Sequence, residues 1–275
     1  MKNKRKIIDR FLCFVLVMLL CVTGAFAAAI GTSKGAMSPR VTSQSYGARL
    51  QEVPLGSYVA DSMRHAAGTD IAIECGGHLV KALPGGEVTE EDARAVFAGD
   101  LDIAVVELTP AMLFDLLEYA VGYGQIDEVE QLDKETGFDG FPQISGFSFE
   151  FDVSQLPGRR LRAVTLDDGR ELRRGDDLVL TAAVPVDMLD GSLGFDMLEE
   201  LAYEVIGTQS ALLIDHIREQ GQIAAPVRGR ITMLGFEQKT IYEKWNVGLY
   251  LPYVILLILL FRLPWRNKRK RGASE

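Results

Sequence analysis

The chain has 275 residues, of which 48% are hydrophobic and 24% are charged, and its formal net charge is −9. This length suits one or two domains, and the composition excludes a chain that is disordered throughout. The three cysteines exclude a scaffold built on disulfides, and the three histidines leave little material for a classical zinc site or a two-metal site.

The charge is unevenly distributed along the chain. Residues 1–10 carry +4 and residues 262–275 carry +5, so the 251 residues between them carry −18. A body this acidic repels the phosphate backbone of nucleic acids. We therefore expect no nucleic-acid partner.

The N-terminus has the features of an export signal. Basic residues precede an uninterrupted apolar run over residues 11–22, and Ala25-Phe26-Ala27 then provides the small residues typical of a cleavage point. Because a membrane-spanning helix needs about 20 residues, this run is short for a span. The sequence predicts a signal peptide over residues 1–27, with an uncleaved anchor as the alternative.

The segment after the signal has a different composition. Residues 28–50 are rich in Ser, Gly, Ala and Thr and have no apolar periodicity, which predicts a flexible lead-in. The main domain is expected over residues 51–235. It begins with a short helix over residues 58–67 and a strand over residues 70–74.

The next part of the domain contains a strand and a capped helix. Residues 103–108 are predominantly apolar and predict a strand buried on both faces. Thr109 and Pro110 then provide an N-cap and a proline at the first helical position. The apolar face of this helix is formed by residues spaced three and four apart, namely Leu113, Leu116, Leu117, Ala120 and Val121.

The second half of the domain mixes strands and helices. Residues 147–152 alternate between apolar and polar and predict a half-buried strand, and residues 178–184 predict another. Two helices are expected, over about residues 195–206 and 210–220. Because strands and helices do not alternate regularly, the predicted fold class is α+β.

The C-terminus predicts a membrane anchor. Residues 247–261 contain no charged residue, the apolar character continues to Trp265, and a basic cluster follows. We predict a single transmembrane helix over residues 246–265 and a basic cytoplasmic tail over residues 266–275. The main domain would then lie outside the cytoplasm, held at the cytoplasmic membrane. A buried C-terminal core helix is the alternative, which the adjacent basic cluster disfavours.

Several stretches of the main domain resemble one known family. The stretches are LGSYVADSMR at 55–64 with TDIAI at 69–73, VVELTPAML at 105–113, FPQISGF at 141–147, and PVRGRI at 226–231. In this order and spacing they are similar to the C-terminal domain of 5′-nucleotidases, a family that includes periplasmic UDP-sugar hydrolases. The resemblance implies the layered fold of that domain over about residues 50–233.

The resemblance also indicates what this chain lacks. A typical member adds a metallophosphatase domain that holds two metals on Asp, His and Asn ligands, whereas the C-terminal domain holds the nucleotide base. These 275 residues contain neither the D-x-H nor the G-N-H motif that supplies such ligands. The resemblance therefore implies no catalytic residue, no metal and no cofactor in this chain.

The positions that hold the nucleotide in the family are altered here. In place of N-G-G-G-I-R, residues 74–79 are ECGGHL, so a glutamate replaces the asparagine and a leucine replaces the arginine. One of the two aromatic residues that stack on the base falls on Gly99, and the other is retained. The resemblance implies at most a weak nucleotide site, and its residues are Phe195, Gly76 and Gly77.

The remaining candidate groups give weak signals. Cys75 and His78 lie three residues apart in a glycine-rich turn, but two ligands do not make a metal site and the sequence indicates no third. His65 is expected to be a surface or packing residue of its helix. His216, beside Asp215, is expected to face solvent.

Three functions stay open. The favoured one is a membrane-anchored, extracytoplasmic module that binds or interacts without catalysis. The second is the nucleotide-binding component of a 5′-nucleotidase-type hydrolase in nucleotide catabolism, working with a metallophosphatase or another exported protein as its partner. The third is a stand-alone sensor of nucleotides or nucleosides. The isolated chain is not expected to be an enzyme.

Overall fold

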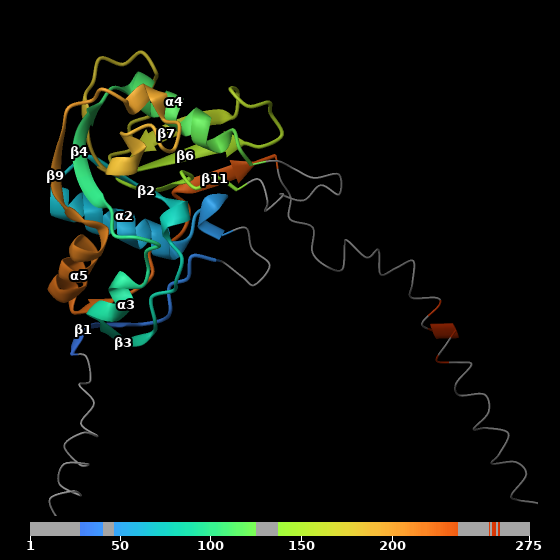
Figure 1. The fold of residues 1–275 in the computed structure, drawn as a ribbon. Helices are drawn as coiled ribbons and strands as arrows, with labels where there is room; N and C mark the ends of the chain where they lie inside the picture. The colour runs from blue at the N-terminus through green and yellow to red at the C-terminus, as the bar shows by residue number, and fades with distance from the viewer. Residues whose placement is uncertain are drawn as a thin grey trace, which may run out of the picture. The chain divides into compact units, whose positions relative to one another are not determined.

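The computed structural model divides the chain into two compact units, Met1–Phe236 and Glu237–Glu275. The fold of the first unit is shown in Figure 1. The residues that the structure describes are 28–40, 47–124, 137–235, 253, 255, 256 and 258.

A five-stranded sheet in the order β5-β2-β8-β4-β9 forms the centre of the first unit. Its strands are β2 (Ile71–Cys75), β4 (Asp102–Leu108), β5 (Pro142–Ser145), β8 (Leu180–Pro185) and β9 (Tyr203–Thr208). β2 and β8 pair in parallel, and β4 is antiparallel to both β8 and β9. The strands β2, β8 and β9 therefore point the same way, and their carboxyl ends meet at one end of the sheet.

One face of this sheet is covered by helix α4 and by a second sheet in the order β11-β6-β7 (Figure 1). These elements are α4 (Pro110–Val121), β6 (Phe147–Asp152), β7 (Leu161–Leu166) and β11 (Ile231–Leu234). α4 begins at its predicted cap, where Thr109 Oγ1 accepts a hydrogen bond from the Met112 N–H at 3.3 Å. The alternation predicted for β6 is confirmed, because Phe147, Phe149 and Phe151 are all buried.

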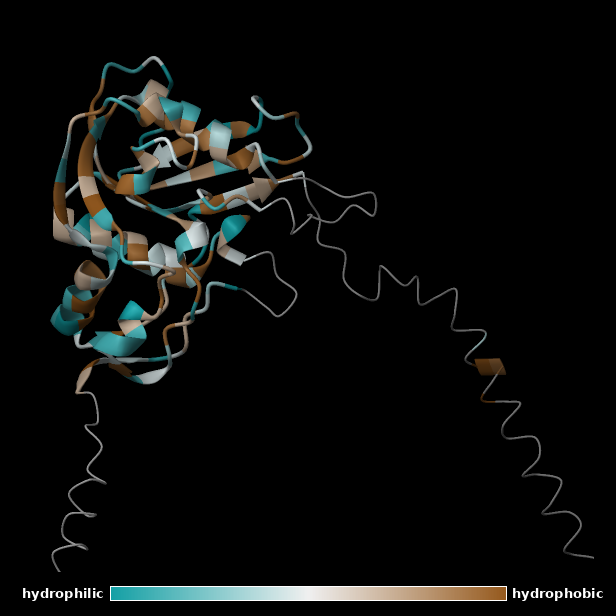
Figure 2. Ribbon diagram, in the orientation of Figure 1, coloured by the Kyte–Doolittle hydropathy of each residue, from teal (hydrophilic) through white to brown (hydrophobic). Residues whose placement is uncertain are grey.

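The opposite face is covered by three helices and a third sheet in the order β10-β1-β3. These elements are α2 (Pro54–Ala67), α3 (Glu90–Arg94), α5 (Gln209–Gln220), β1 (Ala29–Ser33), β3 (Gly86–Thr89) and β10 (Gln222–Ile223). The two faces enclose separate hydrophobic cores, since Ile71 and Ile73 of β2 face α4 whereas Ala72 faces α2. In Figure 2 strand β4 of the central sheet is mostly brown and the outer helix α3 is teal, so apolar residues gather at the sheet and polar residues on the outside. The fold class is α+β, as predicted.

Residues 28–40 differ from the flexible lead-in that the composition predicted. β1 pairs with β3 on one side and β10 on the other, and the Met37 backbone exchanges two hydrogen bonds with Leu83. The small residues of this segment reflect close packing, because a Cβ at Gly31 would lie 2.8 Å from Ile217 Cγ2 of α5. A composition typical of linkers therefore belongs here to the central strand of a small sheet.

Residues 195–206 also differ from prediction, because they do not form an α-helix. A short 3-10 helix (Asp196–Leu198) is followed by β9, the edge strand of the central sheet. Tyr203 and Val205 project from this edge with 54% and 47% of their surface exposed. Aromatic and β-branched residues favour strands, and pairing with β4 decides the conformation. The second predicted helix is confirmed as α5.

The predicted export and membrane segments lie mainly outside the described residues. Residues 1–27 fall there entirely, and of residues 246–265 the structure describes four, all helical and exposed: Tyr253, Ile255, Leu256 and Ile258. Within the described part of the chain, no helix combines the length and the apolar character that a membrane crossing requires. The signal peptide and the transmembrane helix stay predictions.

Candidate functional site

Three strand ends bring a polar cluster together at one end of the central sheet. β2 runs into a 3-10 helix (Gly76–His78), β8 runs into another (Val186–Met188), and β9 runs into α5. Because these three strands point the same way, residues that follow them lie close together. We call the set the His78 cluster, and its members are Glu74, His78, Asp187 and Gln209.

His78 lies between two carboxylates. Its Nδ1 is 2.7 Å from Glu74 Oε1, and its Nε2 is 2.8 Å from Asp187 Oδ2. Glu74 is 0% exposed, and it also accepts hydrogen bonds from the Cys75 backbone N–H at 2.7 Å and from Gln209 Nε2 at 2.8 Å. A buried carboxylate is tolerated when its oxygens are satisfied in this way.

The cluster holds a positive imidazolium at neutral pH. Burial opposes the charged ring, but hydrogen bonds to Asp187 and Glu74 outweigh burial and raise the pKa of His78 from 6.5 to about 10. Burial, and next the Glu74 carboxylate, raise the pKa of the Cys75 thiol well above its ordinary value. Cys75 is therefore a neutral thiol here and neither a nucleophile nor a ready metal ligand.

The structure adds a third group to the Cys75 and His78 pair. Asp187 lies 109 residues from His78 in sequence, and the three residues place potential ligand atoms within 4.8 Å of one another. Each ring nitrogen of His78 already donates a hydrogen bond to a carboxylate, Nδ1 to Glu74 and Nε2 to Asp187. A metal that bound to His78 would have to displace one of these two N–H protons. The donor set therefore does not suit a cation in this protonation state.

Gly76 and Gly77, the two glycines predicted to contact a ligand, stabilise the loop after β2. Their backbone N–H groups donate to the carbonyls of Phe141 and Asp139, each at 2.8 Å. A Cβ at Gly76 would lie 1.9 Å from the Ala48 carbonyl oxygen. Close packing explains Gly76, and ligand binding by Gly76 and Gly77 stays a prediction.

Phe195 is placed inside an aromatic cluster. It is 0% exposed, and its ring contacts Tyr119 and Phe138 at centroid distances of 5.3 and 5.7 Å. Phe138 stacks in turn on Tyr123, with centroids 4.2 Å apart and planes within 7°. The protein's own rings thus cover Phe195, and its contact with a ligand stays a prediction.

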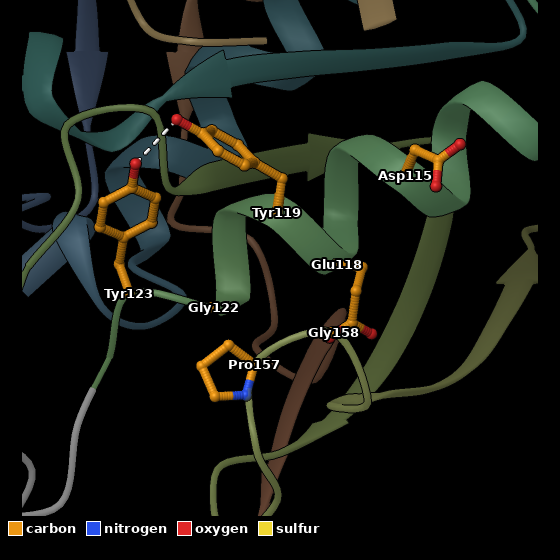
Figure 3. Close-up of a pocket in the computed structure, with 7 residues that line it drawn as sticks. All are labelled: Asp115, Glu118, Tyr119, Gly122, Tyr123, Pro157 and Gly158. Carbon is orange, nitrogen blue, oxygen red and sulfur yellow. Dashed lines mark hydrogen bonds between the residues drawn. The ribbon is translucent and has the colours of Figure 1, made fainter. Parts of the chain in front are cut away.

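A cavity of about 400 Å³ lies beside this aromatic cluster, as Figure 3 shows. Asp115, Glu118 and Tyr119 line it from α4, and the loop at Pro157 closes the opposite side. The hydroxyls of Tyr119 and Tyr123 lie 2.7 Å apart, and burial together with this hydrogen bond raises the pKa of Tyr119 to about 12. The aromatic wall suits a planar or apolar group.

Two further cavities lie elsewhere in the described part of the chain. One of about 620 Å³ is lined by residues of α2 and α5, and another of about 690 Å³ runs beside β4 and β9. Glu74, His78 and Phe195 line none of the three cavities. The His78 cluster thus lies outside these three cavities, and one of its atoms, Asp187 Oδ1, is buried with no hydrogen-bond partner among the described residues.

Sequence reasoning missed the partners that complete the polar clusters. Asp187 and Gln209 have no local motif, because strand pairing alone brings them to Glu74 and His78. His216 was expected to face solvent but is 7% exposed. The spacing of Leu212, Leu213 and Ile217 carries the signal, since His216 belongs to the same helix face.

A family model described as 5′-nucleotidase, C-terminal domain, matches residues 29–200. The trifunctional nucleotide phosphoesterase protein YfkN of Bacillus subtilis (strain 168) is 24% identical over 208 residues, which make up 72% of this chain and 14% of that protein. The match from residue 29 agrees with the place of β1 in the fold.

Solved structures share the fold. A 5′-nucleotidase precursor from Thermus thermophilus superposes with a TM-score of 0.66 at 22% identity, covering 81% of this chain and 43% of that one. The NAD nucleotidase NadN of Haemophilus influenzae gives 0.60 at 16% identity, covering 76% and 38%. The chain thus spans less than half the length of these relatives, and at these identities the likeness concerns the fold alone.

Proposed function

Because the chain belongs to the 5′-nucleotidase C-terminal domain family, we propose that it is a binding or interaction module of this type that does not itself hydrolyse phosphoesters. In this proposal the predicted helix over residues 246–265 holds the domain at the outer face of the cytoplasmic membrane. Its partners are then the membrane and an exported protein or small polar ligand.

The residues that replace the family's asparagine and arginine in the loop after β2 are the main support. Glu74 and Leu79 stand where the resemblance implies an asparagine and an arginine. Glu74 is buried and fully hydrogen-bonded, and Leu79 is buried against the core that contains Phe97. A carboxylate repels phosphate, and a leucine supplies no cation to bind it.

The aromatic cluster supports the same conclusion. A base that stacked on Phe195 would have to displace the ring of Phe138 or Tyr119. Stacking on a free aromatic ring contributes about 1–3 kcal/mol per base. That gain is offset here by the loss of contacts between the protein's own rings.

Hydrolysis and calorimetry test the proposal directly. The purified full-length chain is incubated with AMP or UDP-glucose and divalent metal, and is titrated with the same nucleotides and with adenosine. We expect no product and no heat at millimolar ligand. An intact 5′-nucleotidase is the positive control. Metal-dependent hydrolysis by the purified chain would overturn the proposal, and heat from a nucleoside without hydrolysis would indicate a sensor.

A two-part hydrolase is the second candidate, because the relatives include a nucleotide phosphoesterase of which this chain covers 14%. The chain would then hold the nucleotide while a metallophosphatase in trans cleaves it. The test mixes the full-length chain with the metallophosphatase part of a related nucleotidase. Nucleotide hydrolysis that rises in proportion to added chain supports this candidate, and hydrolysis independent of the chain rejects it.

A further inference from the structure

Helices α2 and α5 place two histidines and a glutamate next to one another, on the face of the central sheet opposite α4. One ring nitrogen each of His65 and His216, and a carboxylate oxygen of Glu219, lie within 4.8 Å of one another. His65 belongs to α2, and the other two residues lie three apart on α5 and so share a helix face. We call these three residues the α2–α5 cluster.

His216 is the buried member of this cluster. It is 7% exposed, its ring lies 5.1 Å from that of His65 and 5.4 Å from that of Tyr58, and its Nδ1 is buried with no hydrogen-bond partner among the described residues. Burial, and next the neighbouring His65, lower the pKa of His216. A buried ring with an unpartnered nitrogen, next to two other potential ligands, is what a bound cation would satisfy.

The other two members are already oriented toward each other. His65 Nε2 lies 2.7 Å from Glu219 Oε2, and both side chains are more than half exposed. Gln220 contacts His216 Nε2 through its side-chain amide at 3.0 Å. Gln220 Oε1 accepts from the Tyr58 hydroxyl at 3.2 Å, so the amide N–H donates to His216 Nε2 and the ring proton lies on Nδ1. Nδ1 becomes free to bind a cation when the amide turns over, because its oxygen then accepts from Nε2–H.

We propose that His65, His216 and Glu219 bind a divalent transition-metal cation, with zinc as the best match, and that the cation bridges α2 and α5. Two imidazoles and one carboxylate form a known zinc ligand set that leaves a fourth position open. Nitrogen donors favour zinc over magnesium and calcium, which prefer oxygen ligands. This site is separate from the His78 cluster and does not depend on the proposed function.

The geometry needs only a small adjustment by the exposed side chains. In a tetrahedral zinc site the donor atoms lie roughly 3.4 Å apart. His65 and Glu219 are 55% and 64% exposed and have room to move, whereas His216 is held by its packing. Both histidines line the cavity of about 620 Å³, which gives the cation access from solvent and room for a water ligand.

The His78 cluster provides a comparison within the same chain. Both ring nitrogens of His78 are engaged with carboxylates, and the Cys75 thiol is protonated. Each cluster has one buried atom without a hydrogen-bond partner among the described residues, Asp187 Oδ1 in the first and His216 Nδ1 in the second. The difference lies in the other groups, because the hydrogen bond between His65 and Glu219 is exposed and easily exchanged for a cation. We therefore expect zinc to bind the α2–α5 cluster more tightly than the His78 cluster.

The test uses the full-length chain without a polyhistidine tag, freed of metal with a chelator. Zinc titration by competition with a chromophoric chelator should give one site per chain, and zinc should raise the melting temperature. Magnesium at the same concentration should do neither. Absence of any zinc site in the wild-type chain overturns the proposal.

Variants and spectroscopy locate the site. We expect His65→Gln and Glu219→Gln each to weaken zinc binding by about tenfold or more. Asp215→Asn, which removes an exposed carboxylate from the same helix, should leave the affinity unchanged. His65 and Glu219 are exposed, so both variants should fold even where a substitution of buried His216 does not. Equal zinc affinity in all four proteins, or a thiolate-to-cobalt charge-transfer band after cobalt substitution, would place the metal elsewhere.

Discussion

His78 shows how single buried contacts make the stability of this domain depend on pH. Its pKa of about 10 in the folded chain exceeds the ordinary value of 6.5. The charged ring therefore stabilises the fold fully below about pH 6.5, and this contribution is lost as the pH rises through 10. We predict that His78→Gln lowers the free energy of unfolding by about 3 kcal/mol at pH 6 and by much less above pH 10. Urea unfolding at several pH values measures the difference.

His65 is the matched control for that measurement. Its Nε2 also lies close to a carboxylate, 2.7 Å from Glu219 Oε2, but both side chains are exposed to solvent. An exposed pair contributes at most about 1 kcal/mol. In metal-free protein, His65→Gln should therefore change stability little at either pH, and a loss at His78 that stays constant with pH would contradict the charged state assigned to its ring.

A substitution at Gly76 tests whether this glycine is needed for packing or for ligand binding. A Cβ at this position would lie 1.9 Å from a backbone oxygen of Ala48, whereas a Cβ at Gly99 meets nothing within 4 Å. We predict that Gly76→Ala lowers the free energy of unfolding by about 3 kcal/mol, and that Gly99→Ala changes it by less than about 0.5 kcal/mol. Thermal unfolding followed by circular dichroism checks both. An unchanged stability in Gly76→Ala would remove the packing explanation.

The sequence predicts which residues of a site lie together only when those residues are close in the chain. The spacing of Cys75 and His78 was visible in the sequence, but their partner Asp187 arrives through strand β8. The solvent-facing position expected for His216 was wrong, because His216 lies on the buried face of α5 with Leu212 and Leu213 and not on the exposed face of Asp215. Long-range pairing thus decides the candidate sites, and no local pattern reports it.

Among the helices and strands, features that depend on nearby residues were predicted correctly, and two elements that depend on distant strands were not. The predicted Thr109 cap depends on residues within one turn and is confirmed. The Thr89 capping box and the glycines that end α2 and α5 in the structure are local in the same way. β1 and β9 depend instead on pairing with distant strands. Their small or β-branched residues have no decisive local preference, so the tertiary fold determines their conformation.

β1 offers a test at the level of one element. It is the central strand of its sheet, and Met37 after it is buried. We predict that a chain lacking residues 1–50 melts about 10 °C below a chain lacking residues 1–27. The reason is that the longer deletion removes β1 and exposes Val88 and Ile223, which are now buried. Differential scanning calorimetry compares the two, and equal melting temperatures would mean that the domain begins at residue 51.

At the scale of the whole molecule, motif order was the most informative feature of the sequence. Family resemblance predicted the layered α+β fold although the bounds of several elements were wrong, because a fold is specified by many stretches in one order. The stretches at 55–73, 105–113 and 141–147 fall on α2 with β2, on β4 with α4, and on β5. These elements are three of the five strands of the central sheet and one helix from each of its faces, so the resemblance covers much of the part of the fold on which the other elements pack.

The distribution of charge along the whole chain predicts how the molecule is held in the cell. Residues 247–261 carry no charge and precede a basic cluster, whereas the body between the ends carries −18. We predict that the full-length chain expressed in a bacterium stays with the membrane after an alkaline carbonate wash, and that a chain ending at residue 236 is released. Leu256→Arg places a cation near the centre of the predicted span, at an insertion cost of about 2.5–3.5 kcal/mol, and should weaken retention. Leu234→Arg, an equal charge change on β11, should not. Release of the unaltered full-length chain by the wash would exclude the anchor, because a spanning helix is not extracted by a change of pH.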